Sequence, residues 1–136
     1  MASGLEEGRV TAAVLIIGDE ILSGRTQDTN LRDIARHLGV LGVDVAEART
    51  VPDDLDVIVE ALNALRTRYD YVITTGGIGP THDDITADAV AAAFGVELEE
   101  HPEIIEMMTR RWGAELNAAR RRMARVPLGG ELVKNP

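Results

Sequence analysis

The chain has 136 residues, which is enough for one hydrophobic core and too few for two of ordinary size. It contains no cysteine, which excludes disulfides, thiolate metal sites and cysteine nucleophiles. The net charge of −9 argues against general nucleic-acid binding, and no apolar run approaches the length of a membrane-spanning helix. We expect a cytoplasmic protein with one domain over residues 9–136, preceded by a flexible start over residues 1–8.

Strands and helices are predicted to alternate from the first apolar segment onward. Residues 10–17 form a continuous apolar run, typical of a strand buried on both faces. Helical spacing of apolar residues predicts a helix over 29–38, and a second strand is expected over 43–51. A second helix follows, and its first amides can be capped by Asp53 or Asp54.

The same alternation continues past the middle of the chain. Residues 71–75 are rich in strand-forming residues, and glycines follow them directly. Thr86 is expected to be the N-cap of a helix over 87–94. Two more helices are expected, one beginning at Pro102 and one over 116–124. This order predicts an α/β fold with a mainly parallel sheet and helices on both faces.

Ligands bind such folds beyond the carboxyl ends of the strands. Three segments should therefore lie close together, namely residues 18–30, 51–54 and 75–86. All three contain carboxylates. We expect the binding site to be built from these three loops.

The third of these loops is rich in glycine. Glycines allow backbone amides to approach a bulky anion, and a helix N-terminus follows them, so phosphate is the expected guest. The pattern is neither a P-loop nor G-x-G-x-x-G, and a tight connecting turn is the alternative. Two adjacent aspartates beside three glycines favour a functional loop over a plain turn. The segment runs Thr74-Thr75-Gly76-Gly77-Ile78-Gly79-Pro80-Thr81-His82-Asp83-Asp84-Ile85-Thr86.

The three loops contain carboxylates, which are unexpected next to a site for an anion. Asp83 and Asp84 would repel a phosphate unless a hard cation such as Mg²⁺ compensates, and one of them can instead act as a general base. Asp53 could converge on the same place, as could Asp19 and Glu20. Equally, Asp53 could only cap a helix, and the other two could only form a solvated turn.

The C-terminal part of the chain has the opposite charge to the rest. Residues 110–136 carry seven basic and two acidic side chains, whereas residues 1–109 carry seven basic and 21 acidic ones. A solvated helix face that balances the acidic body is the favoured interpretation. Contact with a ligand phosphate or a partner surface is the alternative. The arginines involved are Arg110, Arg111, Arg120, Arg121, Arg122 and Arg125.

Three separated motifs resemble the molybdopterin-binding domain shared by MoaB and MogA proteins, the N-terminal part of CinA (competence/damage-inducible protein A) and eukaryotic FAD synthases. They are Gly18-Asp19-Glu20-Ile21-Leu22-Ser23-Gly24 with Asp28-Thr29-Asn30, then Val51-Pro52-Asp53, then Thr74 to Thr86. The CinA-like branch is the closer one, because the Gly-rich motif and His101-Pro102-Glu103 both resemble it. The resemblance implies a three-layer, MogA-like α/β/α sandwich.

The resemblance also implies a pterin ligand and a set of reactions. In cofactor-synthesis members the domain adenylylates molybdopterin or inserts molybdate. In CinA-like members the pocket is associated with metal-dependent hydrolysis of ADP-ribose, and in FAD synthases with hydrolysis of FAD. Asp53 and Asp84 match the two site aspartates of the family, and family members form dimers or trimers.

Two departures from the family pattern matter. Ile78 stands where MoaB and MogA proteins usually carry Thr, which argues against molybdate insertion. Residues 125–136 resemble the segment that leads to a further Leu-Pro-Gly loop, so the domain is expected to be truncated at its C-terminal end.

We thus expect a domain that binds a phosphate-bearing pterin or nucleotide, with a Mg²⁺-dependent pyrophosphatase and a non-catalytic interaction domain as alternatives. The candidate catalytic residues are Asp53 and Asp84, and the candidate Mg²⁺ ligands are Asp83 and Asp84. The candidate ligand-binding residues are Gly18, Asp19, Glu20, Asn30, Thr75, Gly76, Gly77, Gly79, Pro80, Thr81 and Thr86.

Overall fold

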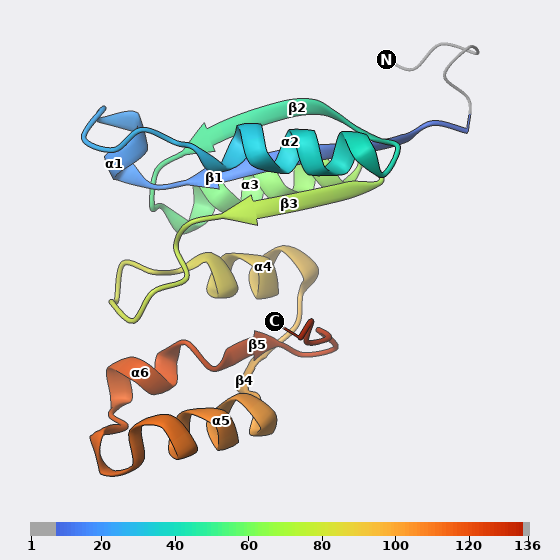
Figure 1. Cartoon of the computed structure of the whole chain (residues 1–136). Helices are drawn as coiled ribbons and strands as arrows, with labels where there is room; N and C mark the ends of the chain where they lie inside the picture. The colour runs from blue at the N-terminus through green and yellow to red at the C-terminus, as the bar shows by residue number, and fades with distance from the viewer. Residues whose placement is uncertain (1–7, 135–136) are drawn as a thin grey trace.

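The computed structural model describes residues 8–134 of the chain (Figure 1). The flexible start expected over residues 1–8 lies outside the described residues, apart from Gly8. None of the helices within residues 8–134 is long and apolar enough to cross a membrane. In chain order the elements are β1 (Val10–Ile17), α1 (Asp19–Leu22), α2 (Asn30–Val40), β2 (Val43–Val51), α3 (Leu55–Arg66), β3 (Tyr71–Thr75), α4 (Thr86–Phe94), β4 (Leu98–Glu100), α5 (Pro102–Trp112), a 3₁₀ turn η2 (Gly113–Glu115), α6 (Ala118–Arg122) and β5 (Arg125–Pro127).

The main sheet has three parallel strands in the order β2-β1-β3. All three strands occupy the residues that the sequence predicts. β1 lies in the middle, and its residues from Ala12 to Ile17 are all buried, as the continuous apolar run requires. Ile17 lies opposite Val51, and Ile16 lies opposite Thr75, so the three strands end at one edge of the sheet.

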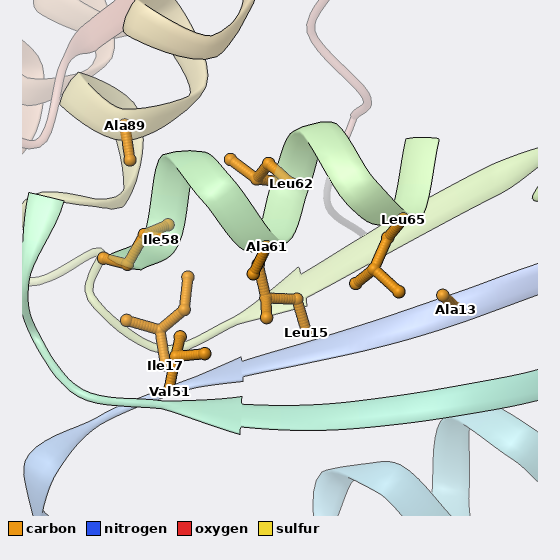
Figure 2. Packing of buried hydrophobic residues seen from close by; sticks show 9 residues of the cluster. All are labelled: Ala13, Leu15, Ile17, Val51, Ile58, Ala61, Leu62, Leu65 and Ala89. Carbon is orange, nitrogen blue, oxygen red and sulfur yellow. The ribbon is translucent and has the colours of Figure 1, made fainter. Parts of the chain in front are cut away.

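Helices cover both faces of this sheet, so the predicted three-layer α/β/α arrangement is confirmed. Figure 1 shows α2 in front of the strands and α3 behind them. Leu15 and Ile17 of β1 point toward Ile58, Ala61 and other residues of α3, and this contact forms the main core (Figure 2). The buried members of the core cluster are Ala13, Leu15, Ile17, Val51, Ile58, Ala61, Leu62, Leu65 and Ala89.

A smaller unit lies on the far side of α4. There β4 and β5 pair in antiparallel fashion, and α5 and α6 lie beside them in Figure 1. Neither strand is predicted from the sequence, because a three-residue strand carries too little periodicity to be recognised. The helix expected over residues 116–124 is wrong in extent. It is shorter, Ala118–Arg122, and the Asn117 side chain caps its first turn by accepting from the Arg120 amide at 2.8 Å.

Helix starts differ from the predictions in one instructive case. Asp54 is the N-cap of α3, and its carboxylate accepts from the Val57 amide at 3.2 Å. Thr86 is not an N-cap, because α4 begins at Thr86 itself and its hydroxyl donates to the Gly76 carbonyl at 2.8 Å. The Thr86 side chain therefore ties the helix to the Gly-rich loop and caps nothing.

Candidate functional site

The first and second loops are joined by a pair of reciprocal hydrogen bonds at the edge where the strands end. The Asp19 amide donates to the Asp53 carboxylate at 3.1 Å, and the Asp53 amide donates to the Asp19 carboxylate at 3.0 Å. Between them, the Gly18 amide donates to the Val51 carbonyl at 3.0 Å. These residues therefore meet as predicted, and their side chains hold two backbone segments 34 residues apart.

Asp53 lies in a markedly negative environment. Burial raises the pKa of Asp53, and the negative charges of Asp19, Glu20 and Asp84 raise it further, although the amide of Asp19 opposes this. Asp53 follows β2 and Asp84 follows β3, so the charge of one motif aspartate acts on the pKa of the other. An acidic group with a raised pKa is better suited to holding a proton than an ordinary surface carboxylate.

Two of the loop glycines are required by the packing of the loop itself. Gly76 has φ +87°, and a β-carbon there would lie less than 3.0 Å from the Ile17 carbonyl oxygen. Gly77 has φ +66°, and a β-carbon there would lie equally close to the Thr86 hydroxyl. The Thr86 amide also donates to the Gly77 carbonyl at 3.1 Å. The glycines thus allow the loop to pack closely against β1 and α4.

Asp84 closes the rest of the loop into a compact turn. Its carboxylate accepts from the Thr81 amide at 2.9 Å and from the Thr81 hydroxyl at 2.8 Å, while the Asp84 amide donates to the Thr81 carbonyl at 3.1 Å. Burial acts to raise the pKa of Asp84, but hydrogen bonds from Thr81 and Gly79 and the charge of Arg122 outweigh it and lower the pKa below its usual value. A β-carbon on Gly79 would lie 2.8 Å from this carboxylate, so Gly79 makes room for it.

Arginines from the far end of the chain supply positive charge to this acidic region. Arg122 donates to the carbonyls of Thr81 and Asp84 at 2.9 and 3.1 Å. Arg125 forms a two-pronged pair with Asp88 of α4, at 3.0 and 2.8 Å. These two are not a solvated face, whereas Arg110 pairs with Glu106 on the exposed surface at 3.7 Å. Arg122 and Arg125 are not among the site residues predicted from the sequence, and their place in an unusually basic run is the signal that points to them.

A cavity of about 230 Å³ opens between the loop after β1 and the start of the Gly-rich loop. Four predicted binding residues contribute to its wall, and they offer a carboxylate, an amide, a hydroxyl and a glycine backbone. This mixture suits a polar heterocycle such as a pterin, which both donates and accepts hydrogen bonds. The lining residues are Ile16, Ile17, Glu20, Ile21, Thr26, Gln27, Asp28, Thr29, Asn30, Thr75 and Gly76.

Other predicted residues do not line this cavity. Pro80 and Thr81 are exposed, and Ile78 is 74% exposed, so its side chain faces away from the protein. Larger apolar hollows of about 400 and 530 Å³ lie elsewhere, and both are lined by Val90 and Phe94 of α4. The chemistry-bearing residues of the cavity therefore do not line these two larger apolar hollows.

The described residues do not by themselves form a Mg²⁺ site. Within residues 8–134, no three or more His, Asp or Glu side chains are grouped to hold a metal ion. Asp83 is 75% exposed and lies 3.4 Å from His82 Nε2, and one Asp84 oxygen already accepts two hydrogen bonds from Thr81. The candidate ligands Asp83 and Asp84 therefore do not fit a Mg²⁺ site made by the described protein side chains alone.

The motifs, the paired aspartates and the cavity occur in a protein with recognisable relatives. A family model described as a probable molybdopterin binding domain matches residues 13–133. The chain belongs to this family. The resemblance of the three loop motifs to molybdopterin-binding domains is thereby confirmed.

Individual relatives of this molybdopterin-binding domain support the CinA-like branch. The chain is 49% identical over 127 residues to a CinA-like protein of Citrifermentans bemidjiense, covering 91% of this chain and 31% of that protein. It is 35% identical to a structure of CinA from Thermoplasma acidophilum, described as having unknown function, with a TM-score of 0.85 over 93% of this chain and 76% of that one. A probable FAD synthase of Caenorhabditis elegans is 43% identical over 102 residues, which are 75% of this chain and 20% of that protein.

Proposed function

We propose that this molybdopterin-binding domain binds a phosphate-bearing pterin or nucleotide at the junction of its three loops. The observation that carries the proposal is the polar cavity between the loop after β1 and the Gly-rich loop, to which Glu20, Asn30, Thr75 and Gly76 contribute. The ring system would occupy this cavity, and the phosphate would lie on the Gly-rich loop next to the N-terminus of α4. The family membership supports a ligand of this class.

The carboxylates near the loop favour a phosphate group of low negative charge over one of high negative charge. Asp19, Asp53 and Asp84 lie at the same edge of the sheet, and Arg122 is the arginine whose charge acts on Asp84. A dianion would have to overcome these carboxylates, so its contacts would come from backbone amides of the loop, which carry no negative charge.

A thermal-shift panel tests the binding proposal. AMP, ADP-ribose, FAD and molybdate would each be added with and without Mg²⁺, and a ligand at 100 times its Kd should stabilise the protein by about 2.7 kcal/mol. Asn30→Ala should raise the Kd of the bound ligand at least tenfold and so reduce the thermal shift, because it removes an amide from the cavity wall. Asn63→Ala on α3 is the matched control, since the Asn63 side chain accepts from Arg66 at 2.9 Å and Asn63 does not line the cavity. Equal responses in the two variants would count against the cavity as the site.

A second candidate function is hydrolysis of a nucleotide pyrophosphate such as ADP-ribose or FAD, with added Mg²⁺ as the metal. It is favoured by the effect of the Asp84 charge on the pKa of Asp53 and by the likeness to a probable FAD synthase. Asp84→Asn should abolish AMP release, whereas Asp56→Asn on the exposed first turn of α3 should leave it unchanged. Equal turnover by Asp84→Asn and the wild type would exclude this function, and a non-catalytic binding domain would then be the remaining alternative.

Two further properties stay predictions. The resemblance leads us to expect a dimer or a trimer of this chain in the cytoplasm. Light scattering coupled to size exclusion would give the mass of the assembly against the 14.7 kDa of one chain. A mass of 14.7 kDa at micromolar concentration would contradict the oligomer.

A further inference from the structure

Arg122 has an unusual position for a residue of a short, basic helix. From α6 it reaches the Gly-rich loop, about 40 positions earlier in the sequence. Its Nε donates to the Thr81 carbonyl at 2.9 Å, and one terminal nitrogen donates to the Asp84 carbonyl at 3.1 Å and, at 3.5 Å, to the His82 carbonyl. One guanidinium therefore gathers three carbonyls of one loop.

Asp88 and Arg125 in turn hold Arg122 in place. A terminal nitrogen of Arg122 lies 3.6 Å from the Asp88 carboxylate, and its side chain is 27% exposed. Arg125 binds the same carboxylate with two hydrogen bonds and also donates from Nε to the Arg122 carbonyl at 3.2 Å. A side chain fixed in this way can impose a geometry on the loop, because its planar donors are already oriented.

Gathering the carbonyls has a consequence for the amides of the same loop. All peptide bonds of the described chain are trans, so the N–H that follows each carbonyl points the opposite way. The N–H groups of His82, Asp83 and Ile85 therefore point away from Arg122. In the part of the chain that the structure describes, none of these three amides donates to a protein acceptor. Each of these three unused donors directly follows a carbonyl that Arg122 binds.

We propose that Arg122 is a positioning residue of the ligand site. By collecting the carbonyls of residues 81, 82 and 84, it turns the free amides toward the opposite side of the loop and holds Asp84 in register with Thr81. The arginine acts through the loop and needs no contact with the ligand. The proposal deepens the proposed function and rests on it, since it supposes that a phosphate lies on this loop.

The arginine run offers a matched control on the same helix. Arg121 pairs with Glu100 at 2.7 Å, and its hydrogen bonds do not involve the Gly-rich loop. Arg121→Gln and Arg122→Gln remove the same charge from adjacent positions of α6. Arg122→Lys keeps the charge but replaces the planar fork by a single ammonium, and it is the second variant if Arg122→Gln does not fold.

The first measurement is amide hydrogen exchange of the full chain without ligand. In Arg122→Gln the amides of Thr81 and Asp84, which close the turn, should exchange at least tenfold faster than in the wild type, while β1 amides should be unchanged. Arg122→Lys should lie between the two, and Arg121→Gln should match the wild type at the loop. Equal exchange at the loop in Arg121→Gln and Arg122→Gln would overturn the proposal.

The second measurement is the Kd for ADP-ribose by calorimetry. Arg122→Gln should raise this Kd at least tenfold, Arg122→Lys should raise it less, and Arg121→Gln should leave it within twofold. A weaker Kd with unchanged loop exchange would mean that Arg122 contacts the phosphate directly, which also overturns the positioning role. If the wild type does not bind ADP-ribose, the proposed function fails for that ligand, while the exchange experiment still decides whether Arg122 positions the loop.

Discussion

The two ends of the molecule are stabilised by different interactions. The sheet half (residues 10–75) has an aliphatic core in which Leu15, Ile58 and Leu65 are fully buried. The C-terminal half (residues 95–134) has only two buried hydrophobic residues among those described, Met108 and Ala124. It is joined to the rest of the molecule in part by arginines that bind carboxylates and carbonyls.

The contrast lies in how the stability of each half responds to its surroundings. Apolar burial is non-directional and stabilises the sheet half as a unit. Partly exposed ion pairs contribute little each and depend on salt and pH. The Gly-rich loop combines both kinds of interaction. Gly76 packs on β1, whereas the carbonyls of Thr81 and Asp84 accept from Arg122. We therefore expect the conformation of the loop to be insensitive to salt and pH at Gly76 and sensitive to both at Thr81 and Asp84.

The largest expected effect comes from the core of the sheet half. Leu15→Ala should cost about 3–5 kcal/mol of the free energy of unfolding, because the fully buried side chain leaves a cavity. Leu116→Ala makes the same change at a half-buried position of the C-terminal half and should cost about 1 kcal/mol. Urea denaturation would measure both. Equal costs would show that the two halves do not differ as described.

The close approach of the loop to β1 gives the second test. Gly76→Ala should destabilise the protein by about 2–4 kcal/mol, because it adds both a clash with the Ile17 carbonyl and an unfavourable positive φ. Gly24→Ala has nearly the same φ, +80°, with no atom near the added β-carbon, and should cost about 1–2 kcal/mol. The difference between the two variants isolates the close approach, and no difference would mean that the loop start is not fixed.

The link between the halves should be weaker than either of these. Asp88→Asn removes the carboxylate that binds Arg125 and lies near Arg122, and we expect a cost of about 1–2 kcal/mol, since the side chains are only partly exposed. The exposed pair of Arg110 and Glu106 serves as a control, and Arg110→Gln should cost below about 0.5 kcal/mol. Hydrogen exchange should rise in β4 and β5 before β1. A uniform rise over the whole chain would contradict separate halves.

The smallest effect is a pH dependence of the two site aspartates. The pKa of Asp53 is raised above 3.8, and the pKa of Asp84 is lowered below 3.8. On acidification Asp53 should therefore take up its proton first. The contribution of Asp84 to stability is present above about pH 3.8 and is lost as the pH falls below that value, whereas ionised Asp53 opposes folding as the pH rises past 3.8.

Carboxyl NMR titration would check this order directly. Asp84→Asn should lower the pKa of Asp53, because one of the negative charges that raise it is removed. Asp56→Asn, which changes a residue outside that set, should leave the pKa of Asp53 where it is. Titration of Asp84 before Asp53 would contradict the electrostatic description of the site.

Strong local patterns account for what could be predicted. The apolar run of β1 and the glycines that follow β3 placed the sheet and the edge where the three loops meet. Thr86 shows the limit, because a threonine before a helix has the same signal whether it caps the helix or donates to a distant carbonyl. Arg122 shows it more clearly, since its partners lie about 40 positions away and leave no trace in local spacing.

The order of elements and the family of this domain can therefore be predicted from the sequence, because periodicity and short motifs are local properties of the chain. Tertiary packing determines that Asp53 accepts from the Asp19 amide while Asp54 caps α3, and that a C-terminal arginine binds the Gly-rich loop. The physical reason is that hydrogen bonds and ion pairs depend on distances in space. Residues far apart in the chain acquire those distances only when the sheet, α4 and α6 have packed.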